Sequence, residues 1–305
     1  MLREKGKEGI FELLFLIIAS ISIVCVLVIC IFLFSEGIPA MTEIGLFDFL
    51  TGTDWTPTAN EPSYGILSMI VGSLYITLGA IIVGVPIGIL TAVYLTKYCP
   101  QKIYKVLKPA VDLMAGIPSI IYGFFGMTVM VPFVKATING IGDILEPATK
   151  VTDRFFYTTG SSIFTASLLL GFMILPTVIG LSESAIKAVP DHYYEGARAL
   201  GATHERTIFK VVLPAAKSGV LASVVLGIGR AIGETMAVIL VAGNQARLTS
   251  SIFDGIRTMT ANVVLEMGYA ADLHREALIA TGVVLFVFVL IINLSFSIIK
   301  RKVGN

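Results

Sequence analysis

Arg230 and Glu234 are the two charged side chains whose positions could do chemistry inside a membrane. They belong to the segment Gly-Arg-Ala-Ile-Gly-Glu-Thr of residues 229–235, within an otherwise apolar stretch. A charge at the centre of a membrane-spanning helix costs about 2.5–3.5 kcal/mol, so it normally faces a bundle interior or a water-filled path. The two residues are four positions apart, and this spacing predicts that they share one face of a helix.

Two interpretations of this pair are open. In the first, Arg230 and Glu234 neutralise each other as a structural pair. In the second, Arg230 is a cationic station for an anion, and Glu234 orients the guanidinium or holds it between passages. The planar guanidinium suits phosphate or carboxylate, and Thr235 adds a hydroxyl nearby. Because Arg230 is the one basic residue deep in a predicted span, a charged substrate would be an anion.

A second candidate site is the polar segment of residues 182–214, directly before the same apolar stretch. Asp191 can cap a short helix, which Gly201 can end in the left-handed conformation. Thr203 can cap a second helix, and Pro214 can start the next span at a position that tolerates proline. We expect a helical hairpin that docks on a cytoplasmic partner, since thirty-odd residues are many for a simple connector.

The composition determines the class of protein that must position these residues. The chain has 305 residues, of which 55% are hydrophobic and only 14% are charged, whereas soluble domains carry about 25% charged residues. This excludes most soluble enzymes and any disordered or nucleic-acid-binding protein. The net charge of +1 gives no case for a polyanionic partner. The cysteines and histidines show no disulfide or metal-ligand spacing, so the sequence indicates a polytopic membrane protein.

We expect an all-α protein with six transmembrane helices, because a membrane-spanning helix needs about 20 mostly apolar residues. The apolar stretches run approximately over residues 13–34, 66–95, 109–134, 161–181, 215–242 and 276–299. The first is too long for the apolar part of a signal peptide and is predicted to be an uncleaved helix. We divide the chain into residues 1–65, with the first helix and an external loop, and a core of residues 66–300.

The distribution of lysine and arginine predicts the orientation of the helices. The N-terminus, the loops at 96–108 and 182–217 and the C-terminal tail carry fifteen basic residues, whereas the alternate loops carry six. Cytoplasmic loops are the ones enriched in basic residues. We therefore expect both termini, and the segment 182–214, to be cytoplasmic.

Small residues interrupt the later spans and predict close packing between helices. In the third span, Gly116, Pro118 and Ser119 are the residues that we assign to a kink and to packing. Pro118 has no N–H to donate to the carbonyl of Met114, so it should kink its helix. The first span has neither Gly nor Pro from Ile10 to Glu36, which suits an outer, lipid-facing helix.

The segment 182–214 resembles the "EAA" loop of ABC importer permeases. That family pattern is Glu-Ala-Ala, three residues, Gly, nine residues, Ile, any residue, Leu-Pro. The spacing here is the same, with Gly196 in place of Ala and Val211 in place of Ile. In the family, the first helix of the loop inserts in a groove of a cytoplasmic ATPase. The resemblance implies this coupling role for the matching residues, which are Glu195, Gly196, Ala197, Gly201, Leu213 and Pro214.

A narrower resemblance, to the PstC-type permeases of phosphate-specific ABC importers, covers nearly the whole chain. It is carried by Trp-Thr-Pro at 55–57, Gly-Ile-Pro-Ser-Ile-Ile-Tyr-Gly at 116–123 and Gly-Arg-Ala-Ile-Gly-Glu-Thr-Met-Ala-Val at 229–238. It implies the type I ABC importer permease fold in a prokaryotic cell membrane. It also implies a sister permease, an ATPase dimer, an external phosphate-binding protein, and phosphate passage at Arg230 and Glu234.

The chain has no Gly-x-x-x-x-Gly-Lys-Ser/Thr loop to hold ATP phosphates, so energy must come from another subunit. We therefore expect a transport subunit that binds no cofactor itself, with ATP and Mg²⁺ on the partner ATPase. The alternatives are a permease for another tetrahedral oxyanion, and a channel or secondary transporter that works without an ATPase. A membrane enzyme has no support, since the motifs HExxH and GxSxG are absent.

Overall fold

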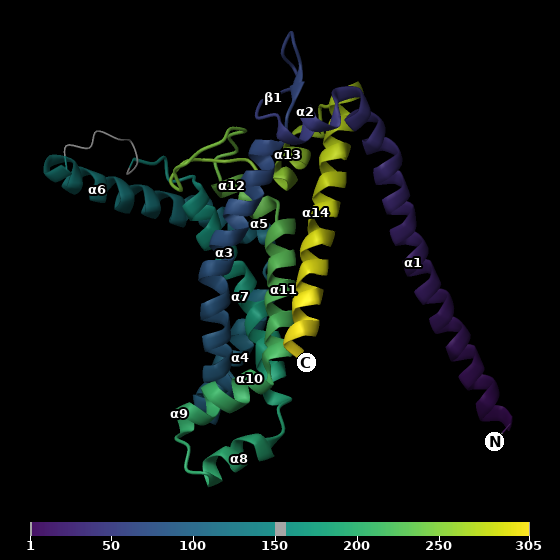
Figure 1. The fold of residues 1–305 in the computed structure, drawn as a ribbon, viewed down its shortest axis with the longest axis vertical. Coiled ribbons are helices and arrows are strands. Elements are labelled where there is room, and N and C mark those ends of the chain that lie inside the picture. Colours follow the sequence, from purple (N-terminus) through teal and green to yellow (C-terminus); the bar gives the residue numbers. More distant parts are fainter. Residues whose placement is uncertain (1, 150–156, 305) are drawn as a thin grey trace.

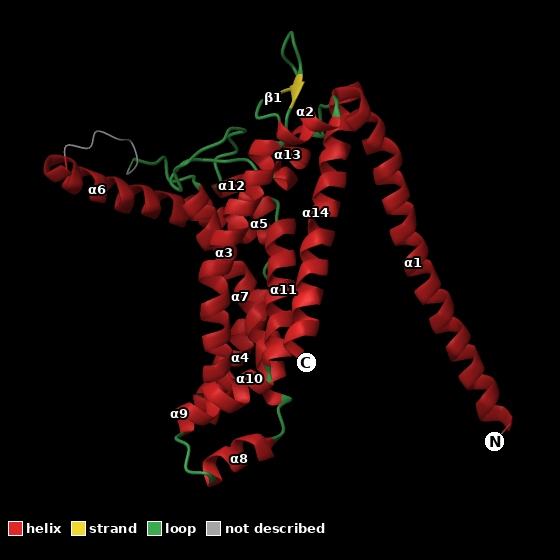
Figure 2. Ribbon diagram, in the orientation of Figure 1, coloured by secondary structure: helices red, strands yellow, loops and turns green. Residues whose placement is uncertain are grey.

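The computed structural model describes residues 2–149 and 157–304, which are mostly helical (Figure 2). Long helices run side by side along the longest axis of the molecule (Figure 1). A β-hairpin projects from one end of this bundle and helix α8 lies at the other, and we call these the hairpin end and the α8 end. The N- and C-terminal ends of the described chain both lie toward the α8 end, as an even number of crossings requires (Figure 1).

Five helical runs in the described residues are long and apolar enough to cross a membrane, and a bent pair supplies a sixth. The five are Phe11–Ile44, Leu67–Tyr98, Ser119–Ile144, Ile163–Lys187 and Asp272–Ser295. The bent pair, His204–Ala215 with Lys217–Gly233, turns by 70°. Five of the six predicted spans overlap with single runs, and the predicted fifth is present if the bent pair is counted as one span. The limits differ from those predicted, and the third and fifth predicted spans contain breaks.

Helix α1 (Leu2–Ile44) contains the predicted first span and extends well beyond both of its limits. From Phe11 to Phe32 its side chains are largely exposed, and in Figure 1 this part diverges from the bundle. Contact begins near the hairpin end, where a Cβ at Gly37 would lie 3.1 Å from the Ala280 Cα of α14 (Asp272–Gly304). A helix that is apolar on all sides and exposed suits a lipid environment.

Helices α3 (Leu67–Val93) and α7 (Ile163–Lys187) form the centre of the bundle. They approach closely through small residues, since a Cβ at Gly84 would lie 2.7 Å from the Gly171 carbonyl oxygen. The main core cluster of buried residues, which includes Leu170, surrounds this contact. This packing agrees with the prediction from the glycine content of the spans.

The third predicted span, at 109–134, is not one kinked helix. Helix α4 (Gln101–Gly116) ends before Ile117, and a new helical run begins with α5 (Ser119–Phe125). Ile117 is extended (φ −73°, ψ 125°), the conformation that a following proline favours. The Tyr122 hydroxyl donates to the Met114 carbonyl over 2.9 Å, so a side chain satisfies a carbonyl at the break. The run continues through a π-helical segment, Gly126–Met130, into α6 (Val131–Thr149), which leads crosswise away from the bundle (Figure 1).

An ionic cluster ties α4, which has no buried residue, to the α8 end of α7. The buried Glu183 carboxylate lies 3.1 Å from Lys108 Nζ and 2.7 Å from Lys187 Nζ, and it accepts a 2.6 Å hydrogen bond from the Tyr104 hydroxyl. These residues belong to α7, which continues to Lys187. The loop predicted to start at 182 therefore starts six residues later, because a paired carboxylate can be buried at a helix end.

The hairpin end is built from short elements that pack residues before α3 against residues of α13 and α14. They are α2 (Leu46–Thr51), strands β1 (Trp55–Thr56) and β2 (Ser63–Tyr64), which pair antiparallel, and α13 (Met259–Glu266). Phe49 and Trp55 are buried in one cluster with Met259 and Leu278. The predicted division at residue 65 stays a prediction, and the parts on its two sides share this core. Of the basic residues counted in the external loops, Lys150 and Arg154 lie outside the described residues.

Candidate functional site

The fifth span is broken between Arg230 and Glu234. Helix α11 (Lys217–Gly233) carries Arg230 in its last turn, and α12 (Met236–Val241) begins after two non-helical residues. Glu234 is extended (φ −72°, ψ 132°). The prediction that the two charges share one helical face is therefore wrong. Gly233 favours a helix poorly, and the carboxylate of Glu234 competes for the amides that a continuous helix would use.

Glu234 bonds to the start of α12 and not to Arg230. Its Oε1 accepts hydrogen bonds from the backbone N–H of Thr235 (3.1 Å) and of Ala237 (3.4 Å). Its own carbonyl accepts a 3.0 Å hydrogen bond from the Thr260 hydroxyl, which holds the break from the side of α13. No Arg230–Glu234 salt bridge exists in this conformation, so the first interpretation of the pair has no support here.

The Arg230 guanidinium has no hydrogen-bond or salt-bridge partner among the residues that the structure describes. It is half-buried, whereas Gly233 and Met236, which flank the break, are exposed. The hydroxyl of Tyr122 in α5 lies within electrostatic range of it. A half-buried cation with no internal partner is a site at which an anion gains more than it would at a compensated pair.

The third and fifth spans meet near their breaks. A Cβ at Gly123 of α5 would lie 2.8 Å from the Ala237 Cα of α12, so the two half-helices are in direct contact. Pro118 precedes α5 and Ser119 is its first residue. Gly116 is exposed at the end of α4, and a Cβ there would meet nothing within 4 Å, so the close approach expected of this glycine is absent.

Two residues that the sequence analysis did not select join this site. Tyr122 closes the break before α5 and lies near Arg230; it stands within the Gly-Ile-Pro-Ser-Ile-Ile-Tyr-Gly segment, which was the available signal. Thr260 donates to the Glu234 carbonyl from 26 residues further along the chain, and nothing in its local sequence indicated this. Thr235 lies at the break, where its hydroxyl donates to the Gly233 carbonyl over 3.3 Å.

The second candidate site, at the α8 end, has the predicted helical hairpin with one difference. Helix α8 (Asp191–Ala199) is followed by Gly201 at φ +84°, the left-handed conformation predicted for it. Thr203 caps α9 (His204–Thr207) by accepting from the Arg206 N–H over 3.3 Å. Asp191 is not a cap: Pro190 holds that position, and the Asp191 side chain makes no capping bond. An N-cap needs a residue before the first helical one.

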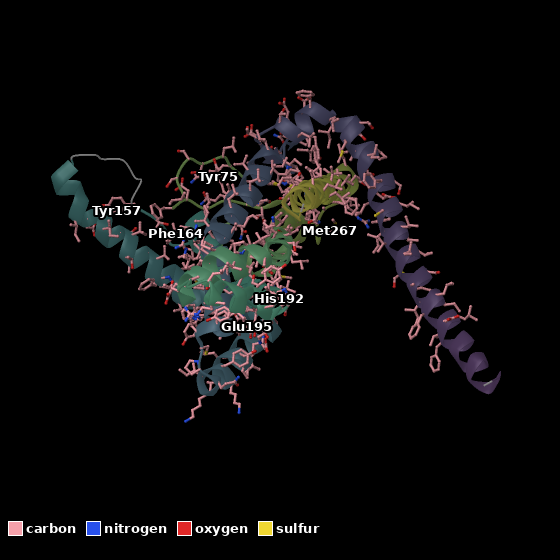
Figure 3. The ribbon with its side chains drawn as sticks, turned by 60° about the horizontal axis from the view of Figure 1, so that its bottom comes forward. Tyr75, Tyr157, Phe164, His192, Glu195 and Met267 are labelled. Atoms are coloured by element: carbon pink, nitrogen blue, oxygen red, sulfur yellow. The ribbon has the colours of Figure 1, made fainter. Side chains whose placement is uncertain are left out.

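Helix α8 stands clear of the bundle at its end (Figure 1), and Figure 3, which brings this end forward, shows His192 and Glu195 on it. Glu195 and Gly196 are exposed, and Ala197 is half-buried. A Cβ at Gly196 would meet nothing within 4 Å, so the alanine of the family pattern would fit here. Leu200 is 91% exposed, an apolar side chain with no cover in this chain.

Pro214 does not start the fifth span. The helix continues through a π-helical segment, Ile208–Val212, and α10 (Leu213–Ala215), and the 70° bend comes at Ala216. Leu213 packs on a separate cluster of buried residues, among them Ala92 and Val212. A hollow of about 270 Å³ lies beside the bend, lined among others by Tyr193 and Gly219. Because α11 runs from this bend to Arg230, one helix connects the two candidate sites.

Known proteins that resemble this chain show the family to which it belongs. Residues 84–305 match the family described as "Binding-protein-dependent transport system inner membrane component". The chain belongs to this family. It is 37% identical over 293 residues to "Probable ABC transporter permease protein YqgH" of Bacillus subtilis, covering 93% of this chain and 89% of that one. It is 34% identical to "Phosphate transport system permease protein PstC" of Mesorhizobium japonicum (87% and 81% covered) and 31% identical to the PstC of Xylella fastidiosa (100% and 95%).

Solved structures support the fold. A permease chain of the MetNI methionine ABC transporter, in an inward-facing form, aligns with a TM-score of 0.60 at 20% identity, covering 78% of this chain and 95% of that one. A bacterial ABC transporter for alginate import aligns with a TM-score of 0.62 at 15% identity, covering 95% and 96%. At these identities the likeness concerns the fold, which is that of type I ABC importer permeases.

The chain is therefore a multi-pass permease subunit of an ABC importer, and ATP is hydrolysed on a separate subunit. A partner permease, an ATPase and a binding protein belong to such an importer in general. This excludes the alternative of a channel or transporter that works without an ATPase, and it excludes a membrane enzyme.

Proposed function

We propose that this permease imports inorganic phosphate and that Arg230 is the cationic station on its path. The observation that carries the proposal is the Arg230 guanidinium at a break in the fifth span, without a partner among the described residues. The relatives named as phosphate permeases support phosphate over other tetrahedral oxyanions. Thr235 adds a hydroxyl at the break, and Glu234 keeps the start of α12 in place through the Thr235 and Ala237 amides.

The partners follow from this assignment. A PstA-type sister permease completes the path opposite Arg230, and a PstS-type phosphate-binding protein delivers its ligand at the hairpin end. A PstB-type ATPase dimer, which holds ATP and Mg²⁺, receives α8, so the permease itself binds no cofactor. The α8 end and both termini are then cytoplasmic, in agreement with the fifteen basic residues counted on that side.

Transport proceeds by alternating access. Closing of the ATPase dimer moves the docked α8, and the bend at Ala216 passes this movement to α11 and to Arg230 at its other end. The exposed Glu195, Gly196 and Leu200 are available for the contact with the ATPase. Docking can shift the equilibrium only through contacts that differ between the two states. The hollow beside the bend leaves room for such a change without rupture of the core.

The test of the substrate is uptake of labelled phosphate, sulfate and molybdate by cells with and without this subunit. Phosphate uptake should depend on the subunit, and excess unlabelled sulfate or molybdate should not compete. Subunit-dependent uptake of sulfate or molybdate with no effect on phosphate would assign the permease to another oxyanion and overturn the proposal.

The test of the coupling segment is Gly201→Val, with Gly196→Ala as the matched control. A β-branched residue at φ +84° costs about 1–2 kcal/mol and should distort the turn after α8. Uptake and ATPase stimulation should fall while the amount of permease in the membrane is retained. The control adds a methyl group that meets nothing and restores the family alanine, so it should transport normally. Normal coupled transport in Gly201→Val would contradict the role of α8.

A further inference from the structure

A buried hydrogen-bond network at the hairpin end is centred on the Glu266 carboxylate. Oε2 accepts from Trp55 Nε1 over 2.8 Å and lies 2.9 Å from His274 Nε2. Oε1 lies 2.6 Å from Arg257 NH1. Glu266, Trp55 and His274 are each at most 8% exposed. One carboxylate thus joins β1, the start of α14, the segment before α13 and α13 itself.

Arg257 extends the network toward α12. Its Nε donates to the Asn244 carbonyl over 3.1 Å, and its NH1 also donates to Asn262 Oδ1 over 3.0 Å. Asn244 has a positive φ of 52°, and its side-chain amide donates to the Ile239 carbonyl over 2.7 Å. The last turn of α12 is therefore held by a residue that Arg257 fixes.

The other end of α12 is held from the same side. Thr260, in the first turn of α13, donates to the Glu234 carbonyl over 3.0 Å. Glu266 lies at the last residue of this eight-residue helix, so its bonds fix the orientation of α13 and with it Thr260. The backbone at the break keeps hydrogen bonds from the Glu234 N–H to Ala231 and from the Ile239 N–H to Thr235, and the contacts of Thr260 and Asn244 add ties from outside the broken helix.

We propose that Glu266 is a positioning residue. Through it, the β-hairpin of β1 and β2 sets the backbone geometry of the break at Glu234. Trp55 and His274 hold the carboxylate; the carboxylate holds Arg257 and α13; and these hold the two ends of α12 through Asn244 and Thr260. A change at β1 is thereby transmitted to the place where Arg230 meets the anion. The transport role of the break rests on the proposed function, whereas the mechanical link rests on the hydrogen bonds alone.

The experiment tests the mechanical link separately from phosphate transport, because its reporter needs no substrate. In a chain without Cys25, Cys30 and Cys99, a cysteine at Met236 (Met236→Cys) reports on the break, because Met236 is 45% exposed beside it. Its rate of labelling by a thiol reagent is measured in membranes, together with phosphate uptake. Trp55→Phe keeps an aromatic side chain, of smaller volume, and removes the N–H donor to Glu266. Thr260→Val removes the hydroxyl at nearly constant volume.

Both variants should change the labelling rate at position 236 by about two- to tenfold, the range that loss of one hydrogen bond produces. Maximal phosphate uptake should fall while the half-saturating phosphate concentration stays the same. Thr260→Ser should restore both quantities, because it keeps the donor. Tyr64→Phe is the matched control, since Tyr64 pairs with Trp55 across the hairpin but makes no bond to Glu266.

Unchanged labelling in both Trp55→Phe and Thr260→Val, at normal amounts in the membrane, would overturn the proposal. An equal change in Tyr64→Phe would also overturn it, because the effect would then be a general loosening of the hairpin. If the unmodified permease imports no phosphate but the labelling changes as expected, the positioning role stands and the proposed substrate fails.

Discussion

Arg230 and Arg257 both belong to the surroundings of the break at Glu234, but they differ in how many hydrogen bonds their guanidinium groups make. Arg257 bonds to Glu266, Asn262 and the Asn244 carbonyl. The Arg230 guanidinium bonds to none of the described residues. Each side chain is partly shielded from water, so each needs compensation for its charge.

The difference separates a cation that serves the fold from one that serves a ligand. A buried charge that is fully paired is expensive to disturb but offers nothing to a substrate. A shielded guanidinium without a partner keeps its fork of donors available for an anion that arrives from outside. The comparison predicts that removing Arg230 damages transport and spares the fold, whereas removing Arg257 damages the fold first.

Arg230→Ala should produce the largest loss of transport. Hydrogen bonds to charged groups contribute about 1.5–3 kcal/mol each, so uptake should fall by about 10- to 100-fold. The amount in the membrane and the thermal unfolding temperature in detergent should stay the same or rise, because an uncompensated charge is removed. The measurements are labelled phosphate uptake and fluorescence-detected thermal unfolding.

Arg247→Ala is the matched control for this variant. Arg247 is 61% exposed in a loop and lies 3.8 Å from Asp254, so its removal should change neither uptake nor stability. Loss of stability in Arg230→Ala, at the size found for a paired arginine, would show that Arg230 is structural.

Arg257→Ala should produce the largest loss of stability. Removing one partner of a buried ion pair costs about 3–5 kcal/mol because the other charge is left uncompensated. Glu266 would keep only Trp55 and His274 as partners. We expect a lower unfolding temperature and less permease in the membrane, with uptake per remaining molecule reduced less than in Arg230→Ala. A stable Arg257→Ala protein that does not transport would reverse the assignment of the two arginines.

The sequence predicted the element that carries Arg230 but not its interruption. Six apolar stretches were sufficient for the spans, because length and apolar composition decide membrane insertion. A four-residue spacing between charges is compatible with one helical face, and only the bond of Glu234 to the amides of Thr235 and Ala237 shows that the helix stops. The break before α5 was easier to anticipate, since Pro118 restricts Ile117 as well.

The α8 end was the more predictable of the two sites because its signals are local. Gly201 and Thr203 act through their own backbone and nearest neighbours, and both have the predicted conformations. The buried hydrogen-bond network centred on Glu266 has no local signal in the sequence. Its partners Trp55 and His274 are 219 positions apart in the sequence, and only the packing of β1 and its neighbours against the start of α14 at the hairpin end brings them together.

Glu234→Gln should have the smallest effect on uptake. It tests the acidic residue at the break as Arg230→Ala tests the basic one. The amide oxygen of glutamine can still accept from Thr235 and Ala237, so the start of α12 is kept and only the charge is lost. Uptake should fall by about threefold or less, the difference between a charged and a neutral acceptor. Glu266→Gln is the contrast, since it leaves Arg257 without a counter-charge in a buried site and should lower the unfolding temperature. A loss of uptake in Glu234→Gln as large as in Arg230→Ala would mean that the two charges pair in another state of the transport cycle, where Glu234 holds the guanidinium between passages.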